Sequence, residues 1–159
     1  MNITIISVGK LKEKFMRQAV DEYMKRLTAY AKVNIVEVPD EKAPENLSLA
    51  QVSAIKQKEG DRILKHITQN AFVITLEVDG KMLTSEQLSE KIEKMSLYGK
   101  SRVVFIIGGS LGISDGIKQR SDMSLSFSKM TFPHQLMRVV LLEQIYRAFK
   151  IMRGEPYHK

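Results

Sequence analysis

The stretch RVVFIIGGSLG, residues 102–112, joins a strongly apolar run to a loop rich in glycine. Branched and aromatic side chains in unbroken sequence, followed at once by turn residues, are typical of a strand buried on both faces of a parallel sheet. Open α/β sheets bind their ligands in loops at the carboxyl ends of such strands. The glycine loop after Ile107 is therefore the first candidate for a functional site.

On either side of this strand, strand and helix patterns alternate along the chain. Short β-branched or apolar runs predict strands at residues 2–8, 33–38, 72–77, 102–107 and 123–127. Apolar residues at i, i+3, i+4 spacing predict helices at residues 15–27, 48–67, 84–95, 115–120 and 134–152. Asp79–Gly80 is expected to be a turn. The alternation predicts an α/β fold with a mostly parallel sheet and helices on both faces.

Composition bounds the number of domains and the class of protein. The chain has 159 residues, of which 43% are hydrophobic, and we expect residues 1–159 to form a single domain. Its longest apolar runs are far shorter than the roughly 18 residues that a membrane span requires, and the N-terminus lacks a signal-peptide pattern. These features predict a soluble, cytoplasmic protein with no membrane association.

Residues that could bind a metal are sparse. The chain has no cysteine, so neither a disulfide framework nor a thiolate zinc site is expected. Its three histidines, at positions 66, 134 and 158, lack the spacing of metal ligands. We therefore expect no metal, and we expect His66 to lie on the surface.

The chain is basic, with 25 Lys and Arg residues against 18 Asp and Glu residues and a formal net charge of +7. Such an excess attracts a polyanion through phosphate neutralisation and counterion release, which makes nucleic acid a reasonable partner. The alternative is that the charge only keeps the surface soluble. The densest basic stretch, residues 9–14 followed by Arg17, comes directly after the first predicted strand, and so at the ligand-binding edge of the sheet.

The final predicted helix, residues 134–152, is unusual because apolar residues occupy nearly every side of it somewhere along its length. Its polar residues change sides between the early and the late part of the helix: His134, Gln135 and Arg138 lie nearly opposite Glu143, Arg147 and Lys150. A surface helix would keep a single polar stripe. A second subunit would cover the additional apolar face, which predicts a homodimer. The alternative is a central helix in a monomeric core.

The loop sequence GGSLG, residues 108–112, also fits G-x-S-x-G, the nucleophile elbow of serine hydrolases. Asp115 or Asp122 followed by His134 would supply the acid and the base in the required order. However, little chain follows the loop to build the larger domain that usually presents such an elbow. The other interpretation, which we favour, makes Ser110 a small polar residue in a turn whose glycines let the backbone approach a ligand.

Four further features of the sequence stand in a distinctive order and spacing: LEVDGK (76–81), FIIGGSLGIS (105–114), LSFSKMTFPHQLMRVVLLEQIYRAFKI (125–151) and PYHK (156–159). Together these segments resemble the RlmH family of SPOUT, or α/β-knot, methyltransferases, and the resemblance spans the whole chain. It implies an S-adenosylmethionine-dependent enzyme that methylates N3 of a pseudouridine in the 23S rRNA of the large ribosomal subunit. It also implies a homodimer whose C-terminal segment is threaded through a loop as a trefoil knot.

In this superfamily the cofactor lies in the knot and is held largely by backbone groups of three loops. The resemblance places the cofactor site at the following positions: Leu76, Gly108, Gly109, Phe127, Ser128, Lys129, Met130, Thr131 and Phe132. A backbone-lined site explains the glycines, and apolar walls suit a buried adenine. From the residues alone, 127–132 would be an ordinary loop between a strand and the final helix, which Pro133 begins.

The resemblance also marks Glu143 and Arg147, at i and i+4 on the final helix, as catalytic positions. A neutral imide nitrogen such as N3 is a poor nucleophile until its proton is removed. Our hypothesis is that Arg147 stabilises the negative charge that develops on the base, while Glu143 orients it or assists proton removal. At this spacing both side chains are able to face the same pocket; the alternative is a plain helix ion pair.

The terminal residues Tyr157, His158 and Lys159 combine aromatic faces with cations, which is the set that holds RNA bases displaced from their stack. The resemblance implies catalytic roles for Tyr157 and His158. It implies RNA contacts for Lys159, where the family often has Arg, and for His134. A frayed tail and a packing role for His134 are the alternatives. The small size of the domain favours a large shaped substrate, the assembled ribosome.

Overall fold

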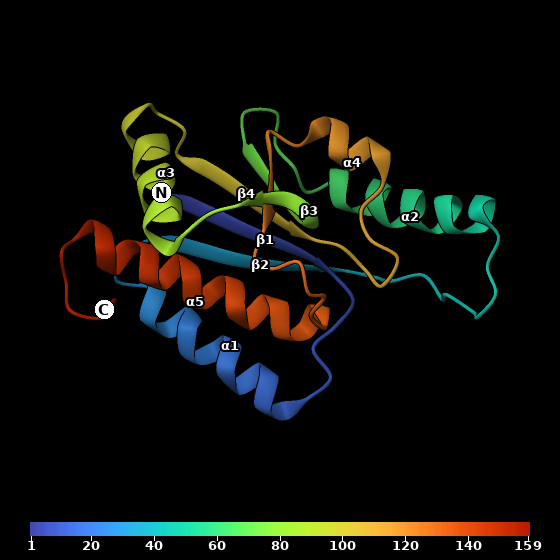
Figure 1. Cartoon of the computed structure of the whole chain (residues 1–159), viewed down its shortest axis with the longest axis horizontal. Coiled ribbons are helices and arrows are strands. Elements are labelled where there is room, and N and C mark those ends of the chain that lie inside the picture. Colours follow the sequence, from blue (N-terminus) through green and yellow to red (C-terminus); the bar gives the residue numbers. More distant parts are fainter.

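Five parallel strands form a single sheet with the spatial order β2-β1-β4-β3-β5 (Figure 1). The computed structural model describes residues 1–159. The strands are β1 (Asn2–Val8), β2 (Lys32–Val38), β3 (Phe72–Met82), β4 (Arg102–Ile107) and β5 (Met123–Ser126). The helices are α1 (Lys14–Leu27), α2 (Leu49–Leu64), α3 (Ser85–Leu97), α4 (Asp115–Arg120) and α5 (His134–Met152). The predicted parallel sheet is confirmed, since every neighbouring pair of strands is parallel.

Helices cover both faces of this sheet, as the alternation of patterns predicts (Figure 1). Successive residues of a strand point to opposite faces, and β4 shows the consequence. Phe105 belongs to a core cluster built with side chains of α1, α3 and α5. Its neighbour Ile106 belongs to a second cluster, built with side chains of α2 and α4. An unbroken apolar run is therefore required in β4, because both of its faces are buried.

The ends of the helices follow local capping chemistry. Ser48 and Thr84 begin α2 and α3, and each side chain accepts a hydrogen bond from the backbone three residues later in a capping box. α2 ends at Leu64, earlier than the predicted helix, which reached Ile67. The backbone N–H groups of His66 and Ile67 bond three residues back, so the chain tightens into a turn there. Ile67 nevertheless packs against the second core cluster.

The structure corrects the predicted turn at Asp79–Gly80. β3 continues through these residues, and Leu76 and Lys81 both pair with Leu125 of β5, so the intervening residues form a bulge. The absence of a side chain at Gly80 permits this pairing, because a Cβ atom there would lie 2.8 Å from the Leu125 carbonyl carbon. Local turn chemistry is therefore overridden by pairing with a strand that lies far along the chain.

One face of α5 is buried within a single chain. α5 lies between α1 and α3 on the sheet (Figure 1), and none of its side chains is fully exposed. Arg138, which the sequence pattern places on a polar side, is only 2% exposed. Leu136, Val140 and Ile151 stay partly exposed, so one chain covers only part of the apolar pattern of α5 and the expected homodimer stays a prediction.

None of the helices combines the length and the apolar composition that crossing a membrane requires. The structure also contains no group of three or more His, Cys, Asp or Glu side chains arranged to hold a metal ion.

Candidate active site

A cavity of about 650 Å³ lies where β3, β4 and β5 end. Its walls come from the β3 bulge, the loop between β4 and α4, the loop between β5 and α5, and the first turn of α5. These are carboxyl ends of parallel strands, where the sequence predicts a ligand site. The volume lies in the range of pockets that enclose a small molecule or cofactor.

A tight turn at Gly109–Gly112 forms one wall of this cavity. The N–H of Gly112 donates to the carbonyl oxygen of Gly109 at 3.0 Å, and Gly112 has φ of +95°. At Gly108 a Cβ atom would lie 2.9 Å from the Ile113 side chain. The first glycine is therefore required by close packing and the last by its left-handed backbone, and the turn presents main-chain groups to the cavity.

Ser110 lies on this turn and is exposed. A nucleophile elbow passes directly from strand to helix, whereas here α4 begins only at Asp115. Ser110 forms no side-chain hydrogen bond, so neither His134 nor an aspartate activates it, although His134 lines the same cavity. The structure thus gives the hydrolase hypothesis no catalytic triad.

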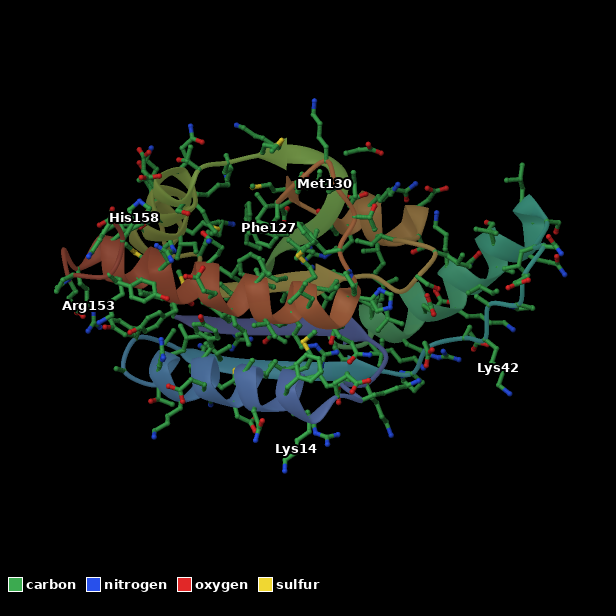
Figure 2. The ribbon with its side chains drawn as sticks, turned by 60° about the horizontal axis from the view of Figure 1, so that its bottom comes forward. Lys14, Lys42, Phe127, Met130, Arg153 and His158 are labelled. Atoms are coloured by element: carbon green, nitrogen blue, oxygen red, sulfur yellow. The ribbon has the colours of Figure 1, made fainter.

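Eight of the nine positions implied for cofactor binding line the cavity: Leu76, Gly108, Gly109, Phe127, Ser128, Met130, Thr131 and Phe132. Lys129 is the exception, since it is exposed and does not line the cavity. Phe127 is half-buried, whereas Met130 is 76% exposed (Figure 2). The loop between β5 and α5 therefore borders the cavity with half-buried residues at its two ends and exposed residues, 129–131, between them.

Glu77, which was not predicted as a site residue, lies at the β3 bulge and lines the cavity. Its carboxylate accepts hydrogen bonds from Thr75 at 2.8 Å and from Ser124, and the Lys118 ammonium lies 3.5 Å away. Burial alone would raise the pKa of Glu77, but these hydrogen bonds and this charge outweigh it and hold the pKa below its ordinary value. The position of Glu77 at the carboxyl end of a predicted strand was the available signal.

A second cluster joins the four predicted catalytic residues. Glu143 Oε1 accepts hydrogen bonds from Arg147 Nη2 at 2.6 Å, Arg147 Nε at 3.0 Å and the Tyr157 hydroxyl at 3.1 Å. Arg147 Nη1 lies 3.1 Å from His158 Nδ1, and His158 Nε2 lies 2.7 Å from Glu86 Oε1. The arginine is thus held by one carboxylate, two tail side chains surround it, and Glu86 of α3 completes the network.

The electrostatics of this cluster fix which groups carry protons. Burial, together with the bond to Glu143, raises the pKa of Tyr157 to about 12. The Tyr157 hydroxyl therefore stays protonated at neutral pH and acts as a donor. The hydrogen bond with Glu143 likewise raises the pKa of Arg147, so its guanidinium keeps its charge. The hydrogen bond with His158 lowers the pKa of Glu86.

The C-terminal tail is folded against the molecule. The ring of Tyr157 packs edge-on against Tyr146 with centroids 5.0 Å apart. Glu155 accepts hydrogen bonds from the Tyr30 hydroxyl at 2.6 Å and from Lys150 at 2.8 Å. The frayed-tail alternative is therefore wrong for residues 155–158, whereas Lys159 is exposed and forms no ion pair or side-chain hydrogen bond.

Within one chain, the structure does not bring the two clusters together. His134 and Met137 of α5 line the cavity, while Arg147 lies three turns or more farther along the same helix. At about 1.5 Å per residue, His134 and Arg147 are separated by roughly 20 Å along the axis. In Figure 2, His158 lies toward the C-terminal end of α5 and Phe127 toward the other end. Glu143 and Arg147 face each other as predicted, but within one chain their cluster lies apart from the cavity.

Two histidines considered in the sequence lie outside the catalytic cluster. His134 is half-buried at the start of α5, with no side-chain hydrogen bond. His66 is exposed, as predicted.

Arg138, which was not predicted as a site residue, is buried and pairs with Glu37 at 2.7 Å. Lys10 and Arg138 line a smaller cavity of about 110 Å³ behind the Gly109–Gly112 turn.

Comparison with known proteins identifies the family. The sequence model of a family described as "Predicted SPOUT methyltransferase" matches residues 1–158. Relatives from Shouchella clausii (strain KSM-K16), Bacillus pumilus (strain SAFR-032) and Alkaliphilus oremlandii (strain OhILAs) are 62%, 62% and 60% identical over 159 residues. Each alignment covers 100% of this chain and of the relative, and each relative is named ribosomal RNA large subunit methyltransferase H. The chain therefore belongs to the SPOUT methyltransferase family, in the group of ribosomal RNA large subunit methyltransferase H proteins.

Proposed function

We propose that this protein uses S-adenosylmethionine to methylate N3 of a pseudouridine in the 23S rRNA of the large ribosomal subunit. The observation that carries the proposal is the glycine-walled cavity at the carboxyl ends of β3, β4 and β5, in a chain whose full length matches its relatives. The formal charge of +7 suits an RNA substrate. The pseudouridine and its N3 atom come from the sequence resemblance.

The cavity fits the cofactor on steric grounds. Apolar side chains such as Leu76 and Phe127 offer walls for an adenine ring. At Gly108 and Gly109 a Cβ atom would lie within 3 Å of neighbouring atoms, so only backbone faces the ligand there. S-adenosylmethionine supplies an electrophilic methyl group on a sulfonium. The residues proposed to hold it are Leu76, Gly108, Gly109 and the loop 127–132, with Lys129 contributing only its backbone.

The second cluster suits the acceptor nucleotide. Removing the N3 proton leaves a negative charge on the base, and the Arg147 guanidinium is held ready to stabilise it. Glu143 Oε1 already accepts three hydrogen bonds, which favours orientation of Arg147 over proton removal. Tyr157 contributes a protonated hydroxyl and His158 an imidazole. Lys159, free at the chain end, is proposed to contact RNA phosphate, as is His134 at the cavity mouth.

A homodimer follows from the separation of the two clusters. Methyl transfer requires donor and acceptor within about 3–3.5 Å, whereas the cavity and Arg147 of one chain are roughly 20 Å apart along α5. We therefore propose that the tail of a second copy approaches the cavity. Mixing an Arg147→Ala protein with a Gly108→Val protein, each inactive alone, should restore activity in mixed dimers. No recovery after subunit exchange would contradict a shared site.

Two further features belong to the same proposal. The C-terminal segment of the family fold is threaded as a trefoil knot, which would shape the cavity from the loops before and after β5. The substrate is the assembled ribosome, whose rRNA presents both the target base and phosphates for the basic residues around Lys10 and Lys12. Such a substrate places the protein in the cytoplasm.

Two measurements test the proposed function, one of cofactor binding and one of methyl transfer to rRNA. Calorimetric titration should detect stoichiometric uptake of S-adenosylmethionine, and a radiolabelled methyl donor should label 23S rRNA in ribosomes that lack the modification. Free 23S rRNA should be labelled poorly. Binding of RNA with no uptake of the cofactor would instead indicate an RNA-binding protein without chemistry, and the proposed function would be wrong.

A further inference from the structure

Glu59 of α2 is a buried carboxylate with no cationic partner. Its side chain belongs to a residue only 5% exposed, and it forms no salt bridge. Its one hydrogen bond comes from the backbone N–H of Glu41, which donates to Oε2 at 3.0 Å. Burying a carboxylate without a counter-charge lowers the stability of the fold. A functional role would explain why Glu59 is present there.

This carboxylate lies directly behind the turn that walls the cofactor cavity. A Cβ atom at Gly109 would lie 2.8 Å from Glu59 Oε1 and 3.2 Å from Oε2. At the next residue of α2, Gly60, a Cβ atom would collide with the Ser114 hydroxyl. Glu59 and Gly60 therefore support the two ends of the loop between β4 and α4.

Only glycine backbone separates the Glu59 carboxylate from the cofactor cavity. Glu59 lines the smaller cavity of about 110 Å³, which shares Gly109, Ser110 and His134 with the larger cavity of about 650 Å³. With no side chain at Gly109, the negative charge is screened on the cofactor side less than in bulk water.

The polar side of the large cavity suits the charged end of the cofactor. Leu76, Phe127 and Phe132 give the other walls an apolar character that suits an adenine ring. With the adenine ring against these walls, the sulfonium and its amino-acid group would face Gly109 and Ser110. This step rests on the proposed function, because it takes S-adenosylmethionine as the ligand.

Charges near Glu59 do not cancel its effect. Arg62 of α2 is a cation that acts on Glu59, but it pairs with Glu41, which adds negative charge of its own. Arg138 lines the same small cavity but pairs with Glu37 at 2.7 Å. Lys10 and Lys12 are exposed, so water screens them. Asp40, also exposed, adds negative charge.

We propose that Glu59 is a specificity-determining residue that favours the cationic methyl donor over its demethylated product. Transfer of the methyl group to N3 breaks the bond between carbon and sulfur and leaves its electron pair on sulfur. The sulfonium thereby becomes a neutral thioether, S-adenosylhomocysteine. The attraction of Glu59 for the ligand is lost at that moment, which promotes exchange of product for fresh donor. At an effective dielectric constant of about 20 and a separation of about 10 Å, the preference is on the order of tenfold.

The test uses the dimeric full-length protein and two ligands, S-adenosylmethionine and S-adenosylhomocysteine, titrated by calorimetry. Glu59→Gln keeps the shape and the oxygen that accepts from Glu41, but removes the charge. Asp61→Asn, on the same helix and exposed, makes the same change in net charge as the control. We expect Glu59→Gln to lower the preference for the donor about tenfold, and Asp61→Asn and the charge-retaining Glu59→Asp to preserve it.

Three outcomes would overturn the inference. A Glu59→Gln protein that binds both ligands more weakly by the same factor would assign Glu59 a purely structural role. An unchanged ratio of the two dissociation constants would remove Glu59 from cofactor recognition while leaving the proposed function intact. Wild-type protein that binds neither ligand would instead refute the proposed function, and the inference with it.

Discussion

Arg147 Nη1 lies 3.1 Å from His158 Nδ1, and this contact fixes the tautomer of the histidine. A guanidinium group can only donate, so Nδ1 must accept and carries no proton. The ring proton of neutral His158 then lies on Nε2, which faces Glu86 Oε1 at 2.7 Å. Arg147 is therefore linked to α3 through the tail, and loss of any member should disturb the others.

Replacement of Arg147 by Ala should lower the methylation rate by about 100-fold or more, because the charge that develops on the base loses its stabilising group. Cofactor affinity should change less than about twofold, since the cavity lies at the other end of α5. Arg153→Ala, which removes an exposed cation near the same helix end, is the matched control and should stay close to wild type. Rate assays with saturating cofactor, paired with calorimetry, make the comparison. Near-normal turnover by a folded Arg147→Ala dimer would remove Arg147 from the mechanism.

Deletion of residues 156–159 should abolish methylation and leave the cofactor dissociation constant within a few-fold of wild type. The free energy of unfolding should fall by about 1–2 kcal/mol, because the packing of Tyr157 on Tyr146 is lost. Denaturant unfolding and calorimetry measure the two quantities. If cofactor binding disappears together with activity, the tail supports the cavity and is not part of the acceptor site.

Gly60→Ala should destabilise the protein by about 1–3 kcal/mol and weaken cofactor binding. A Cβ atom at Gly60 would collide with the Ser114 hydroxyl, which caps α4, and the displacement would reach the turn at Gly109. Gly116→Ala is a matched control, because its Cβ would lie 4.0 Å from the same hydroxyl. That variant should be neutral or slightly more stable. Equal stability of the two variants in urea would show that α2 and α4 are not closely packed.

Glu59→Gln should raise stability at pH 7. Burial raises the pKa of Glu59 and outweighs the lowering by the hydrogen bond from the Glu41 backbone and by the charge of Arg62; the negative charges of Asp40 and Glu41 raise it further. The folded protein therefore binds this proton more readily than the unfolded chain, whose Glu pKa is about 4.3. The contribution of Glu59 to the free energy of unfolding is fully present below its pKa in the unfolded chain. It is lost as the pH rises through its pKa in the folded protein. The advantage of the variant should be largest at pH 7 and shrink toward pH 4, and a less stable variant at pH 7 would contradict the sign.

Most elements of the fold could be predicted from local sequence. The apolar run 102–107 and the helix 134–152 have the observed bounds, because period and end signals agree there. The bulge at Asp79–Gly80 could not be predicted, since it depends on pairing with Leu125. The covering of α5 by α1 and α3 likewise depends on the spatial order of elements that are distant in sequence.

The site was predictable only where its residues had a local signature or a family resemblance. Gly108, Gly109 and the tail residues belong to recognisable segments. Glu59, Glu77 and Glu86 were missed because an acidic residue in a helix, or at the end of a strand, usually indicates a solvated surface. The distance between the cavity and Arg147 could not be predicted, because the sequence does not show where along α5 each loop packs.

The most direct test of the central claim is mass spectrometry of 23S rRNA after incubation of modification-free ribosomes with the protein and S-adenosylmethionine. The proposed function predicts a single added methyl group at N3 of one pseudouridine, absent when Arg147→Ala protein is used. A methyl group on another base or atom, or none from a dimer that demonstrably binds the cofactor, would contradict it.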